Sequence, residues 1–176
     1  MTGFDGSGDL DASVMPLTLR VNGTEHQLSA EPRTTLADAL RDGLGLTGTR
    51  LGCEHGVCGS CTVLLDGTPA RSCLLLAVQC AQFDIRTVEG LATEGTLHPL
   101  QRAFAEEHAL QCGFCTPGFL MTLAGELAAT PDLDLDERRL DEVLASNLCR
   151  CTGYAGIRRA AISAARRMRA ERLSRS

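Results

Sequence analysis

The chain has little aromatic mass: its 176 residues include five Phe, one Tyr and no Trp. Large rings fill much of an ordinary hydrophobic core, so two domains of about 75 residues each would have thin cores here. Small domains of this kind commonly take part of their stability from disulfides or bound metal. Lysine is also missing, and all 17 strongly basic residues are Arg. This bias by itself indicates no function.

Three further absences exclude several classes of protein. The formal net charge of −5 is too acidic for a nucleic-acid binder. No run approaches about 18 apolar residues, so no membrane span is expected. The acidic, Gly-rich stretch 1–15 has neither region of a signal peptide, and we expect a disordered tail there. Without an export signal the expected compartment is the reducing cytoplasm, where cysteines are more often metal ligands than disulfides.

Cysteine is plentiful, and eight of the nine cysteines form two groups of four. Four thiolates are the ligand set of a [2Fe–2S] cluster or of a structural zinc ion. The two groups differ in spacing, so each has to be interpreted by itself. The first group reads Cys53-x4-Cys58-x2-Cys61-x11-Cys73, and the second reads Cys112-x2-Cys115-x33-Cys149-x1-Cys151.

The first group has the C-x4-C-x2-C…C spacing of plant-type [2Fe–2S] proteins. Three ligands so close together require a loop that curls around the metals, and Gly52, Gly56 and Gly59 permit this curvature and the approach of amide N–H groups to the sulfurs. Zinc sites usually pair their ligands in two separate knuckles, which fits this triplet poorly. His55 could be a ligand as in Rieske centres, but four thiolates are already present, so we expect it near solvent.

The second group is less diagnostic, and its spacing leaves zinc, [2Fe–2S] and a redox dithiol open. Thr116-Pro117, directly after Cys115, predicts a capped helix start whose free N–H groups and positive dipole end would face a dianionic cluster. Cys149 and Cys151 cannot share a helix face at positions i and i+2. We therefore expect them on a turn between two helices.

Residues 16–90 have the alternating pattern and the turn pairs of a small α+β domain. We expect two hairpins, a short helix capped by Thr34 or Thr35, the metal loop, and a last strand around Phe83 and Ile85 that reaches Val88. Cys73 would arrive from the strand after the second hairpin turn. The expected strands and turns are 17–21, Asn22-Gly23, 24–28, 62–65 and Asp66-Gly67, and the expected helix is 36–43.

Residues 91–170 change to a helical period, and we expect an all-α four-helix bundle with short loops. Pro99 suits a first helical turn, and Thr130-Pro131 would stop a helix. Residues 89–98 would be the linker, and 171–176 a second tail. The expected helices are 99–108, 116–127, one that begins after an Asp136 cap, and 156–169.

The cysteine loops with their neighbours resemble the small iron–sulfur subunit of the molybdenum hydroxylases, the family of xanthine dehydrogenase, aldehyde oxidase and carbon monoxide dehydrogenase. The resemblance covers about residues 16–168, and its three segments stand in the order that the family has. They are GCEHGVCGSCTV at 52–63, LQCGFCTPG at 110–118 and NLCRCTGY at 147–154.

The resemblance implies a β-grasp, plant-ferredoxin-like first domain and a four-helix second domain, each holding one [2Fe–2S] cluster on its four cysteines. By matching position, Gln111 would contact the pterin of the molybdenum cofactor, and Cys151 would be the ligand nearest to that pterin. The implied function is an electron relay. Electrons would pass from molybdopterin through the second and then the first cluster to FAD or an external acceptor.

The same resemblance implies partners. They are a large subunit with molybdopterin, expected as the cytosine dinucleotide, and a medium subunit with FAD, together forming a dimer of heterotrimers of the bacterial, separate-subunit type. The large subunit would hydroxylate a carbon centre of an aldehyde, a purine, an N-heterocycle or carbon monoxide. The segment HGVCGS at 55–60 stands where the carbon monoxide dehydrogenase subunit usually has TSHCGA, which disfavours carbon monoxide.

Two other functions compete on sequence alone: a free-standing two-cluster ferredoxin and a zinc-stabilised adaptor with no redox role. Three further features have plain interpretations. Cys80 follows an apolar run and is expected to be a buried thiol. Tyr154, the only Tyr, is expected to pack with its hydroxyl bonded. The seven Arg of 156–176 either dock an acidic partner or line a solvated helix face.

Overall fold

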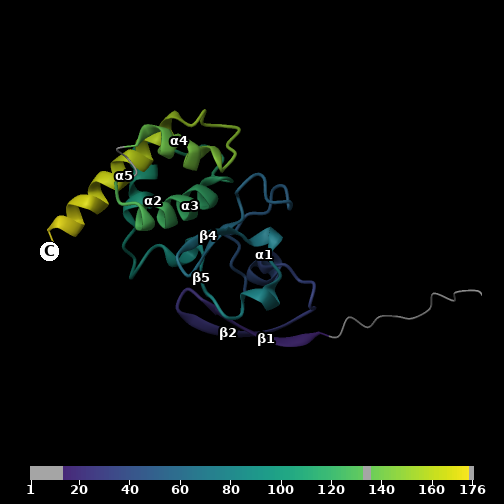
Figure 1. Cartoon of the computed structure of the whole chain (residues 1–176). Helices are drawn as coiled ribbons and strands as arrows, with labels where there is room; N and C mark the ends of the chain where they lie inside the picture. The colour runs from purple at the N-terminus through teal and green to yellow at the C-terminus, as the bar shows by residue number, and fades with distance from the viewer. Residues whose placement is uncertain (1–13, 133–135, 175–176) are drawn as a thin grey trace, which may run out of the picture.

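The computed structural model describes residues 14–132 and 136–174, and the elements of this part of the chain fall into two groups (Figure 1). A five-stranded sheet with a short helix forms the first group, and four longer helices form the second. The α+β class is confirmed. Most of the tail expected at 1–15, and the chain end at 175–176, lie outside the described residues. None of the described helices is long and apolar enough to cross a membrane.

The sheet is mixed, with the strand order β2-β1-β5-β3-β4. Its strands are β1 (Met15–Val21), β2 (Thr24–Ala30), β3 (Thr62–Leu65), β4 (Thr68–Arg71) and β5 (Asp84–Arg86). β1 and β5 run parallel, and the other neighbouring strands are antiparallel. Both expected hairpin turns are present, because Asn22-Gly23 and Asp66-Gly67 each place two successive residues at positive φ.

The last strand is shorter than expected. β5 ends at Arg86, and Val88 lies in a 3-10 turn over Val88–Gly90. The backbone N–H of Thr87 donates to the side-chain oxygen of Asn22 over 2.9 Å. Because a side chain takes this N–H, the strand ladder stops there. The inclusion of Val88 in the strand was wrong, and so was that of Phe83, which precedes the first residue of β5.

A short helix covers the sheet and shares its core. α1 (Leu36–Asp38) continues into a π-helical turn over Ala39–Gly43, and Thr35 caps it by accepting from the Asp38 amide over 3.1 Å. Cys80 is 1% exposed, which confirms the expected buried thiol, and desolvation by burial raises its pKa. The common core includes Leu19, Val21, Leu36, Leu40, Val63 and Ile85.

Four helices occupy the second half, as expected, but the first, second and fourth of them end at residues other than expected. They are α2 (Pro99–Glu106), α3 (Thr116–Ala129), α4 (Glu137–Ala145) and α5 (Ala155–Leu173). α2 stops early because His108 takes a φ of 49°. α5 runs past the expected end at Arg169, and Arg172 bonds its last turn to the Leu127 carbonyl of α3 over 3.1 Å. Residues 171–173 are therefore helical and not a tail.

The helix caps were predicted in part. Asp136 caps α4 by accepting from the Arg139 amide over 3.0 Å, and Thr130 follows the end of α3, both as expected. Thr116 does not cap α3, because Cys115 occupies the N-cap position. Thr116 already lies in the first turn, and its buried hydroxyl has no hydrogen-bond partner among the described residues.

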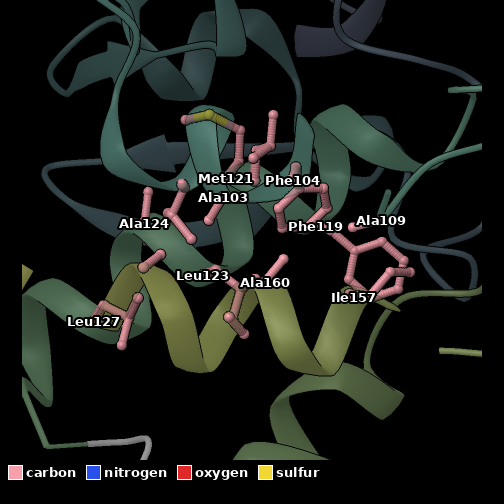
Figure 2. Packing of buried hydrophobic residues seen from close by; sticks show 14 of the residues in the cluster. Ala103, Phe104, Ala109, Phe119, Met121, Leu123, Ala124, Leu127, Ile157 and Ala160 are labelled. Atoms are coloured by element: carbon pink, nitrogen blue, oxygen red, sulfur yellow. The ribbon is translucent and has the colours of Figure 1, made fainter. Parts of the chain in front are cut away.

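The helices pack around one apolar core (Figure 2). Phe104 of α2 and Phe119 of α3 are each 1% exposed, and Ile157 and Ala160 of α5 point toward them. Leu64 of β3 belongs to the same cluster, so the sheet contributes to the helical core. The two halves therefore share buried contacts and are not merely tethered.

Phe104→Ala should lower the free energy of unfolding by about 3–5 kcal/mol, because a large buried ring leaves a cavity in a core that has few rings. Leu173→Ala, at a residue 74% exposed, should change it by no more than about 0.5 kcal/mol. Guanidinium unfolding of the cluster-loaded chain, followed by circular dichroism, measures both. Equal losses would contradict this assignment of the core.

Candidate iron–sulfur sites

The first cysteine group lies on a curled loop between the π-helical turn and the start of β3, with its last member just beyond β4. Cys61 and Cys73 are buried, whereas Cys53 and Cys58 are half-buried. The thiols form two contacting pairs, Cys53 with Cys58 and Cys61 with Cys73. Cys73 follows β4 directly, in a 3-10 turn over Ser72–Leu74. The fold therefore brings all four expected ligands of this group to one place.

Backbone amides of the loop point at these sulfurs. The Cys58 amide donates to Cys53 Sγ over 3.3 Å, and this bond, with another from the His55 amide, lowers the pKa of Cys53 to about 6. Burial raises the pKa of Cys73 to about 11, although the Gly56 amide acts in the opposite direction. Amides that stabilise charge on sulfur also tune the potential of an iron–sulfur cluster. The His55 side chain is exposed, as expected.

The second cysteine group joins two loops. Cys112 and Cys115 precede α3, and Cys149 and Cys151 lie on the turn between α4 and α5, as expected. An outer pair is formed by Cys112 and Cys151, whose sulfurs are 3.6 Å apart and whose side chains are exposed. An inner pair is formed by Cys115, which is buried, and Cys149, which is half-buried. Burial and the neighbouring Cys149 thiol raise the pKa of Cys115 to about 12.

Two neighbours hold Cys149, and the sequence linked neither of them to it, although a bonded Tyr154 hydroxyl was expected. Burial pushes the pKa of Cys149 upward, but hydrogen bonds from the Thr152 hydroxyl and amide outweigh it and leave the pKa lowered. The Tyr154 hydroxyl accepts from the Cys149 amide over 2.9 Å and donates to the Asn147 carbonyl over 3.2 Å. The bonded Tyr154 is thus confirmed. Thr152 was missed, although its place within NLCRCTGY could have indicated it.

The arrangement of thiols fits a two-iron cluster, in which each iron takes two cysteines. Each site offers two close pairs and amide donors aimed at sulfur. In the described part of the chain, no three Cys, His, Asp or Glu side chains converge on a single-ion position. A two-iron centre does not need such a position. It would also remove the cost of charging the buried thiols, because a metal ion deprotonates the thiol that it binds.

The surroundings of the second site are open and apolar. Gln111 and Cys151 are both exposed, so the structure places them at the surface. Three apolar side chains close to them or to Cys149 in the sequence are also exposed: Leu110 at 44%, Phe114 at 45% and Leu148 at 53%.

Two sites of four thiols each, both suited to a [2Fe–2S] cluster, define a two-cluster electron-transfer protein. Residues 19–84 match the family described as "2Fe-2S iron-sulfur cluster binding domain", and residues 87–162 match "[2Fe-2S] binding domain". The chain belongs to the small iron–sulfur subunits of the molybdenum hydroxylases, the xanthine dehydrogenase family. It is therefore the iron–sulfur subunit of an oxidoreductase, which confirms the resemblance found in the sequence.

Three relatives support this membership. The "6-hydroxypseudooxynicotine dehydrogenase complex subunit beta" of Paenarthrobacter nicotinovorans is 59% identical, over 84% of this chain and 92% of its own length. The "Xanthine dehydrogenase iron-sulfur-binding subunit" of Escherichia coli O157:H7 is 47% identical, over 76% of this chain and 84% of its own length. A chain in the crystal structure of quinoline 2-oxidoreductase from Pseudomonas putida superposes with a TM-score of 0.84 at 49% identity, covering 89% of this chain and 97% of that one.

Cys73→Ser should abolish the first cluster and keep the second, because only Cys73 completes the first ligand set. Cys80→Ser is the matched control, seven residues along and also buried. It should retain both clusters and lower the stability by about 1–3 kcal/mol, because a hydroxyl replaces a thiol in an apolar core. Iron and acid-labile sulfide assays read out both variants. Loss of a cluster in Cys80→Ser would contradict the ligand assignment.

Proposed function

We propose that this chain receives electrons from a molybdopterin site on a large partner subunit. It passes them through the second cluster to the first, and from there to FAD on a medium subunit or to an external acceptor. The observation that carries the proposal is the position of the outer pair. Cys112 and Cys151 lie at the surface beside Gln111, while Cys115 and Cys149 lie on the inner side of the same site.

The exposed side of the second site is suited to a protein partner. Leu110, Phe114 and Leu148 stand next to cysteines of this site or to Gln111 in the sequence, and all three expose apolar surface of the kind that partner proteins cover. In this proposal Gln111 bonds the pterin, and Cys151 is the ligand nearest to it. A covered outer pair would also be shielded from water and from oxidation.

The exposed side of the first site would be the exit. Val57 and Leu74 are each 60% exposed on the cysteine loop and the 3-10 turn beside it. They are in the same region, since a Cβ at Gly56, next to Val57, would lie 2.4 Å from Leu74 Cδ1. An acceptor that covers this apolar edge would come close to the Cys53 and Cys58 pair.

The finer organisation belongs to the same proposal. The pterin is the cytosine dinucleotide, the complex is a cytoplasmic dimer of heterotrimers, and the large subunit hydroxylates a carbon centre of its substrate. A ferredoxin-like [2Fe–2S] domain spans residues 16–90 and a four-helix bundle spans residues 91–170. The relatives are subunits of larger assemblies, which favours this function over a free-standing ferredoxin, and paired thiols favour it over a zinc-stabilised adaptor.

In this function the chain binds the two clusters, fixes their orientation and shields them from solvent. When bound, each cluster accepts and releases one electron, so that a two-electron oxidation is divided into single steps. The thiol pairs hold each cluster, and the loop amides stabilise its negative charge. The rest of the fold keeps Cys61, Cys73 and Cys115 away from solvent.

Cys151→Ser in the intact complex should stop electrons leaving the molybdenum site while the first cluster still assembles. The first cluster would then be reducible by dithionite but not by substrate. Rapid mixing with substrate, followed by visible absorbance and electron paramagnetic resonance (EPR), measures this difference. Reduction of the first cluster by substrate at the normal rate would show that the relay is not serial.

Gln111→Ala should weaken association with the molybdopterin subunit and leave both clusters in place. Gln82→Ala, at another exposed Gln in the first domain, is the control and should change neither property. Molybdenum and iron analysis of the co-purified complex separates the two effects. Equal loss of pterin docking and of cluster assembly in Gln111→Ala would contradict the assigned role.

A further inference from the structure

Asn147 lies between the two cysteine sites and is not a ligand of either. It is fully buried and stands two residues before Cys149. Its side-chain Nδ2 donates to the Gly59 carbonyl over 3.1 Å, in the loop of the first site. Moving a buried amide that is hydrogen-bonded across two domains lowers the stability, because each lost hydrogen bond leaves a buried polar group unpaired.

Both ends of the Asn147 side-chain amide are engaged. Its Oδ1 accepts from Thr122 Oγ1 of α3 over 3.0 Å and, at the longer distance of 3.5 Å, from Arg71 Nη2. Arg71 of β4 donates to the Ser146 carbonyl over 2.6 Å and also bonds Thr62 of β3. Side chains from both domains therefore fix this one residue from several directions.

The packing around this amide leaves no room for a side chain at either of two facing glycines. A Cβ at Gly59 would lie 2.6 Å from Asn147 Cγ. A Cβ at Gly118, in the first turn of α3, would lie 2.4 Å from the Gly59 carbonyl oxygen. The cysteine loop, the start of α3 and Asn147 are thus in direct contact, and glycine is required at two of these positions.

The same contact joins ligands of the two sites. The Leu148 amide donates to the Cys58 carbonyl over 2.9 Å. Cys58 belongs to the first site, and Leu148 is covalently bonded to Cys149 of the second. The route from one ligand to the other therefore crosses a single hydrogen bond.

An aromatic side chain provides a second point of approach. Phe114 stands between Cys112 and Cys115 in the sequence, yet its ring reaches the first site. A Cβ at Gly52 would lie 3.4 Å from Phe114 Cε1 and 3.2 Å from Cys58 Sγ. Gly52 is thus flanked by Cys58 of its own loop and by Phe114 of the loop that carries the second site.

We propose that Asn147 is a positioning residue that fixes the separation and orientation of the two clusters, by holding the Leu148 amide on the Cys58 carbonyl. This inference rests on the proposed electron relay. One electron leaves the second cluster, which is oxidised, and enters the first, which is reduced, and no atom or proton has to move. Asn147 contacts neither thiol pair through its side chain and acts only through the loops that it joins.

Asn147→Ala in the cluster-loaded chain tests the proposal. Two reduced [2Fe–2S] clusters held at short range split each other's EPR signals, and the dipolar part of that splitting falls with the cube of their separation. Both clusters should assemble, as judged by iron and sulfide content, but the resolved splitting should be lost or broadened. Electron transfer from the second to the first cluster should also be slower than in the wild type.

Asn22→Ala is the matched control for stability. Asn22 likewise uses both ends of its amide, donating to Thr87 Oγ1 over 3.0 Å and accepting from the Thr87 amide over 2.9 Å, but entirely within the first domain. It should destabilise the chain and keep the wild-type splitting. Loss of splitting in Asn22→Ala as well would attribute the effect to general instability and overturn the proposal.

A second pair of variants decides the matter if Asn147→Ala assembles poorly. Thr122→Val removes the donor to Asn147 and should reduce the splitting, whereas Thr122→Ser keeps the hydroxyl and should restore it. Unchanged splitting in Thr122→Val, or in an Asn147→Ala chain with both clusters, would overturn the proposal. A wild-type chain with fewer than two cluster signals would instead refute the proposed function itself.

Discussion

The hydrogen bond from the Leu148 amide to the Cys58 carbonyl is the interaction on which the arrangement of the two cysteine sites depends. It spans the boundary between the domains and connects a ligand of one site with the neighbour of a ligand of the other. Around it lies a small buried network centred on Asn147, which is fully excluded from solvent. A buried polar network of this kind destabilises the fold when some of its hydrogen bonds are missing. It therefore favours the one arrangement in which all of them form. An electron relay needs one fixed arrangement, because the rate of electron transfer depends on the distance between its two clusters.

Features that depend on a few adjacent residues could be predicted from the sequence. Asn22-Gly23 and Asp66-Gly67 dictate their turns because only a few residue types accept positive φ. The cysteine spacings, with the residues beside them, indicated the ligand sets. The pairing of thiols could not be predicted, because Cys112 meets Cys151 only after α3 and α4 have packed. The cap at Thr116 was wrong for a related reason, since the loop geometry made Cys115 the first residue of helical conformation.

Features that depend on contacts between distant elements could not be predicted from the sequence. The last turn of α5 is held by a hydrogen bond from Arg172 to α3. The residues next to either partner in the sequence do not indicate this bond. Asn147 was visible within NLCRCTGY, but a buried amide and an exposed loop residue look alike in one sequence. Its proposed role follows from its hydrogen bonds to Gly59 and Thr122 and from its close packing on Gly59, which involve two other segments of the chain.

The shortage of aromatic rings affects how the helical half packs. It also gives this half a reason to take stability from a bound cluster. α5 buries Ala160, Ala161, Ala164 and Ala165, so that it can approach its neighbours closely without large side chains. Small residues bury little apolar area per residue, and the stability of such a core is correspondingly limited. Metal–thiolate bonds across the α4–α5 turn and the loop before α3 would cross-link the same helices. Electron transfer and folding would then depend on the same ligands, and the loops that carry the cysteines would gain the rigidity that a fixed inter-cluster distance requires.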